Sequence, residues 1–126
     1  MALSRKELRD GFKAFLQTAY PSFVVSTSRI EDLREIKNAI LVTVENVDID
    51  YQLNGEPDYE AQVNVRYMKR NGTDDELDVV AETIEGVIAT QSPALLGRRA
   101  AVLENISYDD FEQATNAITL SYRVAL

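Results

Sequence analysis

The densest group of side chains that could do chemistry is an acidic cluster at residues 74–78. Asp74, Asp75, Glu76 and Asp78 could offer carboxylate oxygens to a divalent cation. The segment lacks the glycine and the twelve-residue frame of a calcium-binding loop. A helix that begins here explains the same residues, because the helix dipole stabilises acidic side chains near its N-terminus. We therefore interpret the cluster as a helix start and expect no metal site.

A second acidic group, Asp109, Asp110 and Glu112, could perform acid–base chemistry only in an apolar pocket that separates the pKa values of its carboxyls. No pattern places these residues in such a pocket, and we interpret them as part of a polar loop over residues 109–116. The chain has no Cys and no His, which excludes cysteine and histidine metal sites and the usual catalytic triads. Its five glycines form no phosphate-binding loop. We expect neither an enzyme nor a bound cofactor.

Two basic groups have two interpretations each. Arg98 and Arg99 are either a solvated pair or a feature of an interface or lumen. Arg5, Arg9 and Lys13 recur at four-residue spacing. They form either the solvated flank of a helix or a contact with an acidic neighbour. The whole chain has 13 basic and 21 acidic residues, a net charge of −8. This balance disfavours a sequence-independent grip on nucleic acid.

The periodicity predicts two amphipathic helices. The first begins at a capping box, Ser4 to Glu7, and ends before Pro21; the second begins at the capping box Thr73 to Glu76. The Ser92–Pro93 pair predicts a further short helix over PALLGRRAAVL. FVV at 23–25 suits a short strand, while RIEDLREIK at 29–37 suits either a loop or a helical turn.

The pattern of residues 39–67 predicts a long β-hairpin. Tyr59 to Tyr67 alternate apolar and polar residues, and the turn chemistry of residues 54–58 separates them from the strand before. Each arm of about 11 to 15 residues exceeds the usual five or six, so we expect the hairpin to project beyond its core. Apolar positions change from even to odd at Glu45–Asn46, which indicates a bulge, a bend or two halves that bury against different partners.

Residues 106–108 and 117–126 complete the strands. Two helices with one apolar stripe each can cover only one face of a sheet. We therefore expect one α+β domain over residues 1–126: a two-layer sandwich of a mainly antiparallel four- to five-strand sheet, two helices on one face and a projecting hairpin. The polar side chains of that hairpin are either solvated or part of a subunit interface. The predicted interface comprises Val47, Asp48, Ile49, Asp50, Tyr51, Gln52, Glu60 and Gln62.

The order of these segments resembles the tail terminator proteins of long-tailed phages, of the lambda minor tail protein U type. The resemblance spans about residues 4–126 and rests on the N-terminal helix, the hairpin AILVTVENVDIDYQL with YEAQVNVRYM, the helix DDELDVVAETIEGVI, then SPALLGRRAAVL, ISYDD and the final ITLSYRVAL. These are patterns without fixed catalytic residues.

The resemblance implies a structural virion protein. Such a protein forms a hexameric ring on the tail tube, ends tube polymerisation and presents the surface to which the head connector or a completion protein docks; in a contractile tail it also meets the sheath. Under this resemblance Arg5, Arg9, Lys13, Arg98 and Arg99 are candidates for tube, connector or lumen contacts. An acidic surface suits a channel through which DNA slides without binding.

Two other hypotheses stay open: another head-to-tail junction ring, such as a completion or adaptor protein, and a small cytosolic binding module. The charged start of the chain lacks the apolar core of a signal peptide, and no apolar run approaches the ~18 residues of a membrane span. We expect a protein without membrane partners that is assembled in the host cytoplasm and resides at the head-proximal end of the virion tail.

Overall fold

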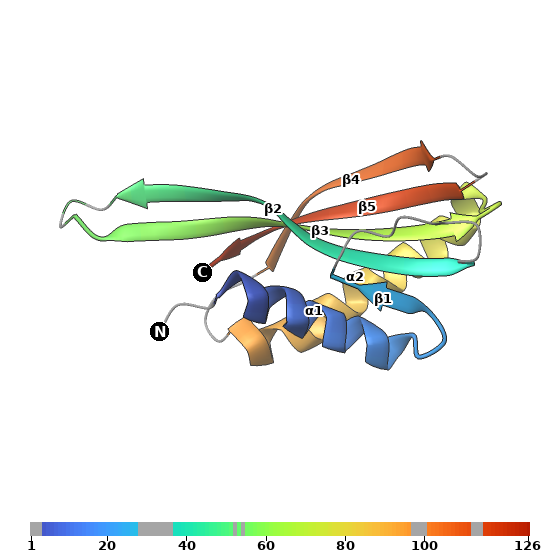
Figure 1. The fold of residues 1–126 in the computed structure, drawn as a ribbon, viewed down its shortest axis with the longest axis horizontal. Coiled ribbons are helices and arrows are strands. Elements are labelled where there is room, and N and C mark those ends of the chain that lie inside the picture. The colour runs from blue at the N-terminus through green and yellow to red at the C-terminus, as the bar shows by residue number, and fades with distance from the viewer. Residues whose placement is uncertain (1–3, 28–36, 52, 54, 97–100, 112–114) are drawn as a thin grey trace.

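The computed structural model describes residues 4–27, 37–51, 53, 55–96, 101–111 and 115–126 (Figure 1). Within these ranges two helices and five strands follow one another along the chain. In order, they are α1 (Arg5–Ala19), β1 (Val24–Ser26), β2 (Asn38–Tyr51), β3 (Pro57–Arg70), α2 (Asp74–Leu96), β4 (Ala101–Phe111) and β5 (Thr115–Ala125).

The strands form one mixed sheet in the order β1-β2-β3-β5-β4. β1 pairs with β2 in parallel, and the other three neighbouring pairs are antiparallel. α1 packs against β1 and β2, and α2 packs against β3, β4 and β5. Figure 1 shows both helices on the same side of the sheet. The expected α+β class is confirmed, with two helices and five strands in the described chain; the parallel β1 makes the sheet mixed.

The core lies between the helices and this face of the sheet. Phe12 of α1 meets Tyr122 of β5 edge to face, with 6.3 Å between ring centroids. The largest buried side chains come from both helices and from β2, β3 and β5: Leu8, Phe12, Leu16, Ile40, Val42, Tyr67, Leu77, Ile84, Ile88, Leu96, Ile118 and Leu120.

Both predicted capping boxes are confirmed. The Glu7 amide donates to Ser4 Oγ at 3.1 Å, and the Ser4 amide donates back to Glu7 Oε1 at 3.3 Å. At α2 the Glu76 amide donates to Thr73 Oγ1 at 3.3 Å, and the Thr73 amide donates to Glu76 Oε1 at 3.2 Å. These bonds satisfy amides at each helix start that have no partner inside the helix.

The prediction of a new helix at Ser92–Pro93 is wrong. α2 continues to Leu96, with Pro93 inside the helix and Ser92 buried in its apolar stripe. Contact with α1 supports this last turn: a Cβ at Gly11 would lie 2.4 Å from Leu95 Cδ2, so only a glycine leaves room for the leucine as it stands. Tertiary packing thus overrides the local preference of proline for a helix start.

The predicted continuation of that helix to Leu103 and the predicted loop over 109–116 are also wrong. β4 begins at Ala101 and runs to Phe111, and β5 begins at Thr115. Strand β4 has its own register shift between Leu103 and Asn105, which hides its alternation from a period-of-two pattern. Asp109 and Asp110 are therefore strand residues opposite β5, and Glu112 lies outside the described residues.

The parity change in β2 is a β-bulge. Val44 pairs with Val63 and Asn46 pairs with Gln62, so Glu45 is the extra residue and has no residue opposite it on β3. Because one residue is added, Val44 and Val47 both lie on the face of the sheet that packs against the helices. The bulge therefore preserves a single apolar face along β2 while it bends the strand.

Tyr67 should make the fold sensitive to alkaline pH. Its side chain is 2% exposed, its hydroxyl donates to Asn38 Oδ1 at 2.5 Å, and burial raises its pKa to about 12. An unfolded tyrosine ionises near 10, so the unfolded chain loses this proton first. Stability is then retained below about pH 10 and falls as the pH rises toward 12, by roughly 2–3 kcal/mol from this group.

Urea unfolding between pH 8 and 11.5 measures this effect. We expect the Tyr67→Phe variant to be less stable at pH 8 by about 1 kcal/mol, because it loses the bond to Asn38, and to lose less stability above pH 10. Burial also raises the pKa of Tyr122, so part of the alkaline loss should persist. An unchanged loss in Tyr67→Phe would contradict the assignment; Tyr51→Phe, at an exposed tyrosine, is the control.

Candidate functional site

The β2–β3 ladder continues past the end of β5. The last β5 residue in the ladder, Ala125, pairs with Glu60, whereas β2 and β3 remain paired as far as Tyr51 and Pro57. We call residues 48–51 and 57–60 the distal hairpin. Figure 1 shows it extending well beyond both helices.

One face of the distal hairpin is apolar and uncovered. Ile49 lies opposite Tyr59, and Tyr51 lies opposite Pro57, on the face that continues from Val47. Ile49 is 55% exposed and Tyr51 is 70% exposed. Cross-strand apolar pairs of this kind normally help to hold a sheet on its core. Here they lie beyond the end of the helical layer of the described chain and form an exposed apolar surface.

The opposite face of the distal hairpin carries like charges directly across from one another. Asp48 pairs with Glu60, and Asp50 pairs with Asp58. Like charges at opposed positions destabilise a sheet. Arg123 relieves one of these pairs, because its Nε lies 2.6 Å from Glu60 Oε1. Asp48 and Asp50 form no hydrogen bond or ion pair with the described residues, so this face favours a cationic partner.

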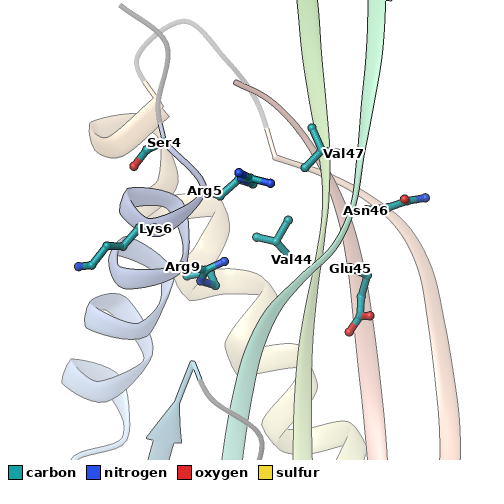
Figure 2. Close-up of a pocket in the computed structure, with 8 residues that line it drawn as sticks. All are labelled: Ser4, Arg5, Lys6, Arg9, Val44, Glu45, Asn46 and Val47. Carbon is teal, nitrogen blue, oxygen red and sulfur yellow. The ribbon is translucent and has the colours of Figure 1, made fainter.

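An open groove of about 580 Å³ lies where α1 approaches the bulge of β2 (Figure 2). We call it the α1–β2 groove. Arg5 and Arg9 extend from α1 toward β2, while Val44 and Val47 project from β2 toward the helix. The complete lining is Ser4, Arg5, Lys6, Arg9, Val44, Glu45, Asn46 and Val47.

The α1 wall of the groove is basic, and two of its three basic side chains, Arg5 and Arg9, are not paired within α1. Lys6 Nζ lies 2.7 Å from Asp10 Oδ2, and this hydrogen bond lowers the pKa of Asp10. Glu7 is held in the capping box. Arg5 and Arg9 form no ion pair or side-chain hydrogen bond within the described ranges. Their guanidinium groups are therefore available to an acidic ligand or partner.

The β2 wall of the groove is apolar. Val44 and Val47 pack against the edge of the core but stay partly exposed. Glu45 is exposed and accepts a hydrogen bond from Thr43 Oγ1 at 2.7 Å. The groove thus has one basic wall and one apolar wall, with an acidic side chain at the bulge between them.

The acidic cluster lies in the first turns of α2, so the predicted helix start is confirmed. Lys69 Nζ donates to Glu76, which lowers the pKa of that carboxyl. Tyr108 of β4 donates to Asp78, and this bond raises the pKa of the tyrosine. Among the described residues no group of three acidic, histidine or cysteine side chains is arranged to hold a metal ion.

The structure divides the predicted interface between two faces. Val47, Ile49 and Tyr51 share the apolar face, and Asp48, Asp50, Glu60 and Gln62 lie on the opposite one. Val47 also packs on the monomer core. Of the predicted basic contacts, Arg5 and Arg9 line the groove, whereas Lys13 does not. Gln52, Arg98 and Arg99 lie outside the described residues.

The sheet face away from the helices is a second surface, and it is largely polar. Arg66 Nε donates to Thr119 Oγ1 at 3.0 Å across β3 and β5. Next to this pair, Asn64 Oδ1 is buried without a hydrogen-bond partner. A small apolar cluster of Ala39, Leu41, Met68 and Ala117 lies at the other end of the face.

Sequence reasoning missed part of the groove and the direct opposition of the hairpin acids. Val44 and Glu45 were not predicted as site residues, although the parity change marked their position. The opposition of Asp48 to Glu60 requires the hairpin register. The second arm was predicted to begin at Tyr59, whereas β3 begins two residues earlier at Pro57, because proline is tolerated at the first position of a strand.

No protein-family model matches the chain, and no curated protein matches it either. In the structure as described, no helix has the length and apolar character needed to cross a membrane.

Proposed function

We propose that this protein is a structural ring protein of a phage tail, in which six copies cap the head-proximal end of the tail tube, end its polymerisation and offer a docking surface to the head connector. The observation that carries the proposal is the distal hairpin, which exposes Ile49 and Tyr51 on one face and Asp48 and Asp50 on the other. A monomer gains nothing from such a projection. A partner that covers it would gain both apolar burial and charge pairing.

A ring of identical subunits needs two different surfaces on each copy, because its contacts run head to tail. The distal hairpin and the α1–β2 groove supply two such surfaces with opposite charge. The acidic balance of the chain also suits a channel through which DNA passes, because like charges disfavour adhesion.

Mass measurement of the purified protein tests the ring. We expect light scattering and native mass spectrometry to detect one oligomer of about six copies at low salt, with dissociation as the salt concentration rises, because exposed charge pairs are screened within about 10 Å at 0.1 M. A strict monomer at every concentration and salt condition would contradict the ring and would favour a small binding module.

Electron microscopy of particles assembled without this protein tests its role. Overlong tails without heads would support termination. Tails of normal length that fail to join heads would support a completion or adaptor ring instead. Intact, infectious particles would contradict both roles.

A further inference from the structure

We propose that the α1–β2 groove is the receptor for the distal hairpin of the next copy of this chain, and that this contact is the repeating joint of the ring. The inference rests on the proposed ring and goes further, because it assigns both halves of the joint to named residues. The donor half is the distal hairpin, and the acceptor half is the pair of walls formed by Arg5 and Arg9 on one side and Val44 and Val47 on the other.

The two faces of the hairpin match the two walls of the groove. An entering hairpin end can place Ile49 and Tyr51 against Val44 and Val47, while its opposite face places Asp48 and Asp50 against Arg5 and Arg9. A two-stranded ribbon with one apolar and one acidic face suits a groove with one apolar and one basic wall. The groove volume of about 580 Å³ suits a few side chains from the end of the hairpin.

Charge is distributed along the chain in the same way. Residues 45–60 contain six acidic residues and no Lys or Arg. Residues 4–13 contain four basic and two acidic residues, in a chain whose net charge is −8. Both acids of residues 4–13 already have partners within α1 or its cap. Attraction between copies is therefore strongest when the hairpin of one meets the α1 of another.

The opposed acids explain why a second copy stabilises the hairpin. In the monomer Asp48 faces Glu60 and Asp50 faces Asp58, and Arg123 offsets the charge of Glu60. Two guanidinium groups from the next copy would neutralise this face. Because donor and acceptor surfaces are distinct on each copy, the contact is heterologous and its repetition can close a ring.

Charge reversal on each half, followed by their combination, tests the joint. Arg5→Glu with Arg9→Glu, and separately Asp48→Lys with Asp50→Lys, should each weaken assembly by about tenfold or more, as judged by sedimentation at several concentrations. The chain with all four substitutions restores opposite charges and should recover the ring. The hairpin pair alone should raise the melting temperature of the monomer, because each new lysine faces an acid.

The outcomes distinguish failure of the proposed joint from failure of the proposed ring. If the wild type forms a ring and the reversals leave it unchanged, or if the combination fails to recover it, the joint is wrong and the ring proposal stands. If the wild type never assembles, the ring proposal fails as well. Circular dichroism on each variant establishes that it is folded before assembly is measured.

Cysteine cross-linking locates the contact directly, since the natural chain has no cysteine. Leu53→Cys at the hairpin end and Lys6→Cys at the groove, in one chain, should give a ladder of covalent multimers with a short bis-maleimide. Leu53→Cys with Val79→Cys, on the exposed face of α2, is the matched control and should give no ladder beyond dimers. Equal ladders from both pairs, or none from the first, would overturn the proposed joint.

Discussion

Ile49→Asp is expected to abolish ring assembly while it shifts the thermal unfolding midpoint of the monomer by no more than about 2 °C. The side chain is 55% exposed, so the monomer loses little contact. In the ring it would be covered, and each subunit contact would lose about 1.5–3 kcal/mol of apolar burial. The new carboxylate would also be buried against the apolar wall of the next copy, at a further cost.

This loss recurs at every joint of the ring, which makes it one of the largest effects a single surface substitution can have. Val79→Asp is the matched control: Val79 is 66% exposed on α2, away from the hairpin and the groove. It introduces the same charge and should leave assembly intact. Equal losses of monomer stability and assembly in Ile49→Asp, or loss of assembly in both variants, would contradict a specific hairpin interface.

The elements that sequence patterns predicted best are those whose signals are local. Ser4 with Glu7 and Thr73 with Glu76 marked both helix starts, because a capping box is made within four residues. The apolar stripes of α1 and α2 included six helical residues that are buried: Leu8, Phe12, Leu16, Leu77, Ile84 and Ile88. The change of parity at Glu45 predicted the position of the bulge.

The elements that were predicted wrongly depend on contacts across the fold. Pro93 remains in a helix because Leu96 is buried and Leu95 packs over Gly11 of α1, which no local pattern shows. Residues 106–108 were predicted as strand, but the two ends of β4 were predicted as helix and loop, because the register shift after Leu103 breaks the alternation and because β4 pairs only with β5 in the described sheet. Local propensity is outweighed in both places by packing.

The residues of the candidate site could be predicted in part, but their arrangement could not. The hairpin residues and the Arg5–Arg9 stripe could be named from their spacing, since each is a feature of one element. Their arrangement in space could not be predicted, because the groove forms only where the helix meets the bulge and because the hairpin register decides which acids lie opposite one another. A contact between copies of the kind we propose would leave no local pattern within one copy.

Deletion of Glu45 is expected to leave the monomer folded and to prevent ring assembly. Without this residue the ladder from Val44 to Tyr51 becomes regular, and Val47, Ile49 and Tyr51 keep the face they have now. The bend that the bulge gives to β2 would be lost, so the distal hairpin would leave the core in a different direction. A hairpin that points elsewhere cannot reach the groove of the next copy.

Glu45→Ala separates the bulge from the charge of its side chain. This variant keeps the extra residue, loses the bond from Thr43 and removes one acid from the groove, so its assembly should equal or exceed that of the wild type. Hydrogen exchange of the β2 and β3 amides checks that the deletion keeps the ladder, and sedimentation measures assembly. Normal rings from the deletion would show that the bulge has no part in aiming the hairpin. Rings lost from both variants would assign the effect to the carboxylate instead.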